Sequence, residues 1–136
     1  SGANLNRVDL GGMNLSGINF TGATLTGSIL SNTNLRDADM SGADLYEASL
    51  HYSNLSGAKL DNTTMNGADL TFANLRGASL KNANLTDVNL SHADVTNVDF
   101  TGVNTQTLLA NPALWRQPNL NHHRHAERFR VGMNPL

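Results

Sequence analysis

The chain has 136 residues and a formal net charge of −2, with 15% charged and 5% aromatic residues. The length fits one domain, and the shortage of large aromatic side chains argues for a core built from many small equivalent units rather than for a typical globular enzyme. The lack of cysteine excludes a disulfide framework and a cysteine-based zinc site, and no apolar run is long enough for a signal peptide or a membrane span. We therefore expect a soluble protein, most simply a cytoplasmic one, although no targeting motif assigns a compartment.

From Ala3 to Gly102 the sequence repeats every five residues without an insertion, as in ADLYE at 43–47. The third position falls on every multiple of five and is Leu, Met, Phe or Val in all 20 repeats. The first position is small or aliphatic throughout, the second is Asp or Asn in 14 of 20 repeats, and the fifth is Gly in nine. Period five is neither the helical period of 3.6 nor the strand period of 2, so the pattern indicates a repeat architecture.

Two inward positions separated by one outward residue suit a short extended segment followed by a tight turn. The outward Asp or Asn can accept hydrogen bonds from nearby backbone, and Gly or Asn at the fifth position tolerates unusual dihedrals. Four segments and four turns would make a square coil of twenty residues, and stacked coils would bury the apolar columns. Five coils at roughly 4.8 Å each predict a rod about 24 Å long.

The pattern A-(D/N)-L-x-x resembles the pentapeptide-repeat family, and the resemblance covers residues 1–104. It implies an all-β fold, a right-handed quadrilateral β-helix of about five coils. It implies little about activity, because a fold does not determine a function.

The two ends of the pattern also carry information. Ser1 and Gly2 already match positions four and five of a preceding repeat, which indicates a fragment of a longer protein, a first coil that meets a partner, or a cloning remnant. The pattern stops at Thr105, and residues 105–136 are predicted to form a C-terminal cap with a short helix, followed by a basic tail. The cap candidates are Leu108, Leu109, Leu114 and Trp115.

Catalysis is not expected. The acidic residues of the repeats all fall at outward positions, on flat convex walls without loops, whereas catalytic carboxylates need a concave, water-poor site. In the tail, His122 and His125 could face a metal ion together with Glu127, but no fourth ligand follows, so a solvated basic helix is the better interpretation. The sequence therefore predicts no catalytic residue, no cofactor and no metal site.

One corner of the predicted coil collects aromatic residues. Residues 52, 72 and 92 are spaced by twenty and would stack, with His51 and Tyr46 on adjoining positions. We predict a protein-binding strip there, because exposed aromatic side chains anchor interfaces; the alternative is that the rings only stabilise the solenoid. The strip comprises Tyr46, His51, Tyr52, Phe72 and His92.

The basic tail is a second candidate surface, able to dock on an acidic surface of its own rod or of a partner. Its candidate residues are Arg124, Arg128 and Arg130. Four arginines in residues 105–136 are too few to predict nucleic-acid binding.

The sequence thus favours a non-enzymatic scaffold or protein-interaction module with an unidentified protein partner, and it allows dimerisation through an end of the solenoid. One alternative is a DNA-mimicking gyrase binder, as the resemblance to the family implies. However, duplex DNA of the same length carries on the order of 14 negative charges, whereas residues 1–104 hold ten acidic against five basic side chains. A further alternative is the repeat module of a secreted bacterial effector.

Overall fold

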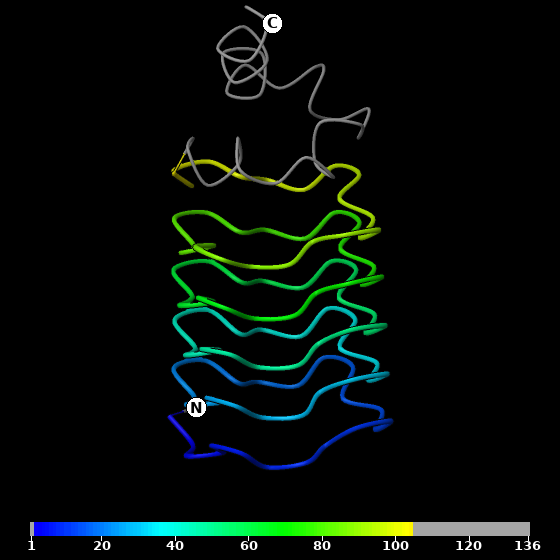
Figure 1. Cartoon of the computed structure of the whole chain (residues 1–136), viewed down its shortest axis with the longest axis vertical. Coiled ribbons are helices and arrows are strands. Elements are labelled where there is room, and N and C mark those ends of the chain that lie inside the picture. Colours follow the sequence, from blue (N-terminus) through cyan, green and yellow to red (C-terminus); the bar gives the residue numbers. More distant parts are fainter. Residues whose placement is uncertain (1, 105–136) are drawn as a thin grey trace, which may run out of the picture.

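The computed structural model describes residues 2–104, which wind into a rod of stacked coils (Figure 1). Parallel bridges join each second-position residue to the one twenty residues later, from Asn4 with Thr24 to Ser79 with Asp99. Twenty residues, or four repeats, therefore make one coil, as the sequence predicts. Residues 2–104 contain sixteen such single-residue bridges and neither a helix nor a longer strand, because each extended segment reaches a turn after one bridging residue.

The bridges lie in four columns, which we call walls 1 to 4 in chain order. Their second-position residues are Asn4, Thr24, Asp44, Thr64 and Asn84 for wall 1; Asp9, Ile29, Ser49, Asp69 and Asn89 for wall 2; Asn14, Asn34, Asn54, Asn74 and Asp94 for wall 3; and Asn19, Asp39, Lys59, Ser79 and Asp99 for wall 4. Corners A, B, C and D are the turns that follow walls 1, 2, 3 and 4, and each comprises the fourth and fifth positions of a repeat.

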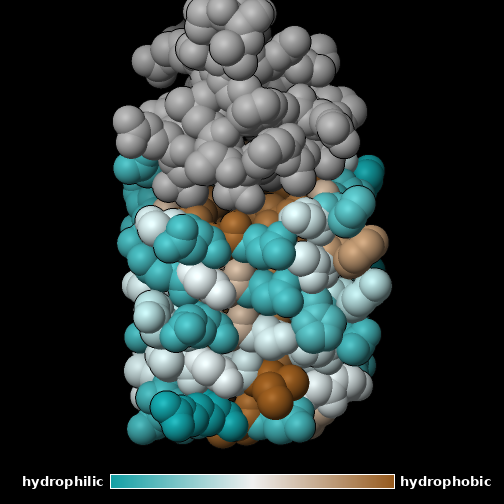
Figure 2. All heavy atoms as spheres, viewed as in Figure 1, coloured by the Kyte–Doolittle hydropathy of each residue, from teal (hydrophilic) through white to brown (hydrophobic). Residues whose placement is uncertain are grey.

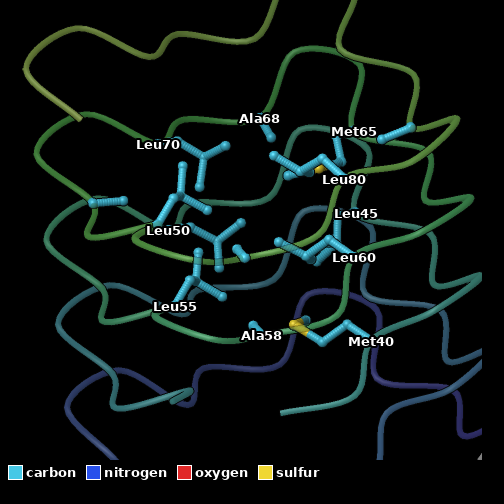
Figure 3. Close-up of a cluster of buried hydrophobic side chains, with 14 of the residues drawn as sticks. Met40, Leu45, Leu50, Leu55, Ala58, Leu60, Met65, Ala68, Leu70 and Leu80 are labelled. Atoms are coloured by element: carbon cyan, nitrogen blue, oxygen red, sulfur yellow. The ribbon is translucent and has the colours of Figure 1, made fainter. Parts of the chain in front are cut away.

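The core runs along the axis of the rod. Third-position side chains from Leu25 to Phe100 are at most 2% exposed, and first-position alanines pack beside them. Figure 3 shows leucines from different walls, among them Leu45, Leu50 and Leu55, gathered in one interior cluster. In the first coil described, Leu5 is only half-buried and Met13 is 46% exposed.

In a repeat with Asp or Asn at its second position, such as residues 43–47, all five backbone N–H groups have an acceptor. The first-position N–H closes the preceding turn, the second and third bond to neighbouring coils, the fourth bonds to the Asp or Asn side chain two residues earlier, and the fifth bonds to the next coil. In residues 43–47 the acceptors are, in order, the carbonyls of Met40 (3.0 Å), Ala23 (2.9 Å) and Thr64 (2.7 Å), the Asp44 carboxylate (3.1 Å) and the carbonyl of Asn66 (2.9 Å). The preference for Asp or Asn at the second position is thus explained: its oxygen satisfies a turn amide that no carbonyl reaches.

Fifth positions share one backbone conformation. All of them, from Gly2 to Gly102, have positive φ between 53° and 79°. Together with the bond from the first-position N–H to the third-position carbonyl three residues earlier, this is the signature of a type II turn. The left-handed conformation explains why Gly and Asn are frequent there.

Hydroxyl side chains replace alanine at four inward first positions. Those of Thr33, Ser53 and Thr63 donate to the carbonyl three residues earlier, at 2.6 to 2.8 Å. The hydroxyl of Ser28 is fully buried and has no hydrogen-bond partner within residues 2–104.

We expect the substitution Ser28→Ala to raise the free energy of unfolding by about 1 kcal/mol, because it removes a buried polar group that is not hydrogen-bonded. Urea denaturation followed by circular dichroism measures the change. Ser53→Ala is the matched control, and it should be neutral or lower the free energy of unfolding by up to about 1 kcal/mol, since that hydroxyl is bonded. A loss of stability in Ser28→Ala would contradict the prediction.

Candidate interaction surface

Three aromatic side chains form a stack at corner B, which we call the aromatic ladder: Tyr52, Phe72 and His92. The Tyr52 and Phe72 ring centroids are 4.9 Å apart with planes inclined by 1°, and those of Phe72 and His92 are 4.7 Å apart with planes inclined by 12°. The spacing matches the rise between neighbouring coils. Because the faces of the rings are turned toward one another along the axis, the ladder presents ring edges, the tyrosine hydroxyl and the imidazole nitrogens to solvent. Tyr52 is 57% and Phe72 49% exposed.

His51 precedes Tyr52 in the same turn and contacts its ring edge-on, with centroids 5.9 Å apart. Its Nδ1 lies 2.9 Å from the Ser49 Oγ and 3.8 Å from an Asp69 carboxylate oxygen. The Ser49 hydroxyl is also 2.9 Å from that of Ser31. The side chain of His51 is thus held against wall 2 by a polar network that begins beside the ladder.

This network is not a catalytic triad. A triad places the serine and the carboxylate on opposite ring nitrogens, so that one nitrogen takes the serine proton while the other is oriented by the acid. Here Ser49 and Asp69 both approach Nδ1 of His51. The arrangement orients the imidazole but does not activate a nucleophile.

Tyr46 lies at corner A, on the opposite edge of wall 2 from Tyr52 in the same coil. It is 46% exposed and takes part in none of the ring contacts within residues 2–104. The five residues predicted as one strip therefore occupy two corners, four at corner B and Tyr46 at corner A, with wall 2 between them. Ile29, 42% exposed, lies on this same wall.

Sequence reasoning missed Ser49 and Asp69 as neighbours of His51. The spacing of twenty could have found them, because it places Asp69 directly above Ser49 and His51 directly above Ser31. The two other predicted surfaces, the cap residues Leu108, Leu109, Leu114 and Trp115 and the basic tail residues Arg124, Arg128 and Arg130, lie outside the described residues.

Most of the surface around this site is polar, and Figure 2 shows a face of the rod on which hydrophobic residues form only small patches. Two carboxyl groups on walls 3 and 4 have lowered pKa values. The pKa of Asp39 is lowered mainly by the backbone amide and hydroxyl of Ser41. Partial burial raises the pKa of Asp94, but hydrogen bonds from Thr96 and Arg76 outweigh it, so that its pKa also lies below the ordinary value.

These lowered pKa values predict a loss of stability in acid. A carboxyl whose pKa is lower in the folded than in the unfolded chain stabilises the fold above its unfolded pKa of about 4, and that contribution is lost as the pH falls through the folded value. We expect the urea midpoint of Asp39→Asn/Asp94→Asn to fall less than that of the wild type between pH 7 and pH 3. The amide oxygen keeps the turn acceptor, so the fold should be retained. Equal losses in variant and wild type would contradict the assignment to these carboxyl groups.

Within residues 2–104, no three His, Asp or Glu side chains are grouped as metal ligands. The same part of the chain has no helix of the length and apolar character needed to cross a membrane.

The parallel bridges at an offset of twenty, the buried third positions and the repeated turns define a four-sided pentapeptide solenoid. In agreement, the family profile "Pentapeptide repeats (8 copies)" matches residues 3–42, 28–67 and 65–102. The chain belongs to the pentapeptide-repeat family.

Solved structures show the same fold. A pentapeptide repeat protein, Rfr23, from the cyanobacterium Cyanothece 51142 matches with a TM-score of 0.72 and 28% identity, over 75% of this chain and 83% of that chain. HetL from the cyanobacterium Nostoc sp. strain PCC 7120, a pentapeptide repeat protein involved in heterocyst differentiation regulation, matches with a TM-score of 0.51 and 31% identity, over 75% of this chain and 59% of HetL. Among curated proteins, none matches this chain significantly.

Proposed function

We propose that the chain is a non-enzymatic protein-binding module, a right-handed quadrilateral β-helix whose partner contacts the aromatic ladder together with His51 and Tyr46. The observation that carries the proposal is the backbone conformation of the ladder. Tyr52, Phe72 and His92 have φ values of 60°, 60° and 62°. Positive φ is uncommon for bulky side chains and is adopted most readily by Gly and Asn.

The magnitudes argue against a purely structural role for the ladder. A left-handed conformation costs roughly 1–2 kcal/mol for each L-residue, and an aromatic pair contributes roughly 0.5–1.5 kcal/mol. Three strained residues therefore cost about 3–6 kcal/mol, whereas the two stacked pairs and the edge-on pair of His51 with Tyr52 contribute about 1.5–4.5 kcal/mol. The rings thus give little or no net stabilisation, and Gly or Asn at these positions would give a rod of similar stability. Exposed bulky residues that break a local preference without a gain in stability are expected at functional sites.

Membership of the family supports a scaffold or interaction role over catalysis, and HetL is a family member involved in regulation. The alternative of a DNA mimic receives less support from the charges of the rod. Residues 1–104 hold ten acidic and five basic side chains, a net density well below the one charge per ≈ 1.7 Å of duplex DNA.

The test compares proteins captured from a lysate of the source organism by the immobilised 136-residue chain and by Tyr52→Asn/Phe72→Asn. Asn occupies other fifth positions with the same φ, such as Asn62 and Asn82, so the variant should fold and its free energy of unfolding should change by less than about 1 kcal/mol. We expect a protein retained by the wild type to be lost from this variant, with affinity lowered more than tenfold when the two purified proteins are titrated.

The matched control is Asn62→Gly/Asn82→Gly, which changes two fifth positions of neighbouring coils at corner D. It should retain the captured protein. Two results would refute the proposal in favour of a structural ladder. One is that the ladder variant captures the same proteins as the wild type, and the other is that it loses several kcal/mol of stability.

A further inference from the structure

The charges of the rod are distributed unevenly around its axis. The half made of walls 1 and 2 with corners A and B carries five acidic side chains and one basic, Arg7. The other half carries five acidic and four basic side chains. The acidic residues of the first half are Asp9, Asp44, Glu47, Asp69 and Asp87.

The acidic residues of the two halves also differ in their partners. In the second half three of the five acidic side chains are paired with a basic group: Arg36 lies 3.6 Å from Asp37, Arg76 3.2 Å from Asp94, and Lys81 3.8 Å from Asp99. Within residues 2–104, none of the five acidic side chains of the first half has a lysine or arginine at ion-pair distance. This half therefore presents carboxylates that an incoming cation can pair with.

Glu47 and Asp87 lie on the same corner, separated by one coil that carries Gly67. The side chain of Glu47 extends across Gly67, where a Cβ atom would lie 3.2 Å from the Glu47 Cγ. The missing side chain thus leaves room for Glu47 to extend along corner A toward the coil of Asp87. Across wall 2, Asp69 lies beside His51 at 3.8 Å.

The exposed rings lie on this acidic half as well. Tyr46 directly precedes Glu47 and has no stacked partner within residues 2–104, so its ring face is open to a cation. A guanidinium group suits such a site, because it pairs with carboxylates, stacks on aromatic faces and is weakly hydrated. The edges of Tyr52 and Phe72, and Ile29 on wall 2, offer apolar contacts to the residues beside that group.

We infer that wall 2 and its two corners bind an arginine-bearing segment of a partner protein. Its guanidinium groups contact Glu47, Asp69 and Asp87, and an apolar neighbour packs on the ladder. This inference rests on the proposed protein-binding function and adds the chemistry of the partner to it.

The test titrates the 136-residue protein into a fluorescein-labelled 12-residue peptide of alternating arginine and leucine, followed by fluorescence anisotropy. The first variant is Glu47→Gln/Asp69→Asn/Asp87→Asn, on the acidic half. The matched variant is Asp37→Asn/Asp39→Asn/Asp61→Asn, on the other half, with the same change in net charge. The Asn substitutions keep the turn acceptors of Asp39 and Asp69, and circular dichroism checks both folds.

We expect the first variant to weaken binding about tenfold, as the loss of three exposed ion pairs allows, and the matched variant to weaken it less than threefold. A glutamate–leucine peptide of the same length should not bind. Equal weakening by both variants would show that the peptide senses only net charge, and would overturn the inference. If the peptide binds only after Arg124→Gln/Arg128→Gln/Arg130→Gln, the site is assigned to the chain's own tail. That result would also overturn the inference that a separate partner protein binds there.

The two proposals fail in distinguishable ways. In one case, the captured protein is lost from Tyr52→Asn/Phe72→Asn but binds the acidic-half variant as tightly as it binds the wild type. The ladder would then remain a binding site, and the inference that the partner contributes arginine side chains would be rejected. Alternatively, binding of the arginine peptide could depend on Glu47, Asp69 and Asp87 while the ladder variant captures the same proteins as the wild type. That result would support the acidic surface as a binding site and refute the ladder as one.

Discussion

Leu55→Ala should lower the free energy of unfolding by about 3 kcal/mol, within the range of roughly 2–5 kcal/mol for buried Leu→Ala changes. Leu55 is fully buried, with Leu35 and Leu75 at the equivalent positions of the coils below and above. Those neighbours are held by backbone bonds to adjacent coils, for example from the Leu35 amide to the Asn54 carbonyl at 2.7 Å. They are therefore unable to move inward and fill the cavity. Urea unfolding followed by far-ultraviolet circular dichroism at pH 7 measures the loss.

Leu5→Ala is the matched control for this prediction. Leu5 occupies the same third position of a repeat but is only partly buried in the first coil described. It should lose less than half as much stability as Leu55→Ala, because less apolar surface returns to water. Equal losses at the two sites would show that the cost does not depend on burial within the stack, and would contradict the account of the core.

The core of this protein could be predicted from the sequence almost residue by residue. A period of five with two inward positions admits one register, and a one-residue shift would place Asp44 inside and Leu45 outside. The structure confirms that register, since Leu45 is fully buried and its amide bonds to the next coil at 2.7 Å. Asp44 faces outward and accepts from the Tyr46 amide. Burial constrains inward positions strongly, so the pattern there is informative.

The arrangement of the outward residues could be predicted only in part. The spacing of twenty correctly brought together Tyr52, Phe72 and His92, and the same register places Tyr46 at another corner of the same wall, although it was predicted as part of one strip. The spacing did not show that Ser49 and Asp69 both approach Nδ1 of His51. The reason is physical: outward side chains are not held in place by packing, and their contacts depend on rotamers and on partners in neighbouring coils. At the inward first positions the pattern predicts burial but not hydrogen bonding: Ser28 and Ser53 are both buried, although only the Ser53 hydroxyl is bonded within residues 2–104.

The turn positions support a second large prediction: Gly77→Val should lower the free energy of unfolding by about 2 kcal/mol. An L-residue in the left-handed region costs roughly 1–2 kcal/mol, and a β-branched residue lies at the upper end of that range. Gly77 has a φ of 69°, and an added Cβ would meet nothing within 4 Å. The substitution therefore adds its Cβ without a steric clash, and the expected loss comes from the backbone conformation. Thermal and urea unfolding of variant and wild type measure the difference.

Gly77→Asn tests whether the loss of stability comes from the left-handed backbone conformation or from the loss of glycine itself. Asn32, Asn62, Asn82 and Asn97 hold the same conformation at φ near 60°, because the short amide side chain tolerates it. We therefore expect Gly77→Asn to stay within about 1 kcal/mol of the wild type. If Asn and Val destabilised the rod equally, the turn would be selecting for a missing side chain rather than for a left-handed backbone. The ladder residues would then not be strained relative to Asn, because such strain requires the cost at a fifth position to depend on which side chain occupies it.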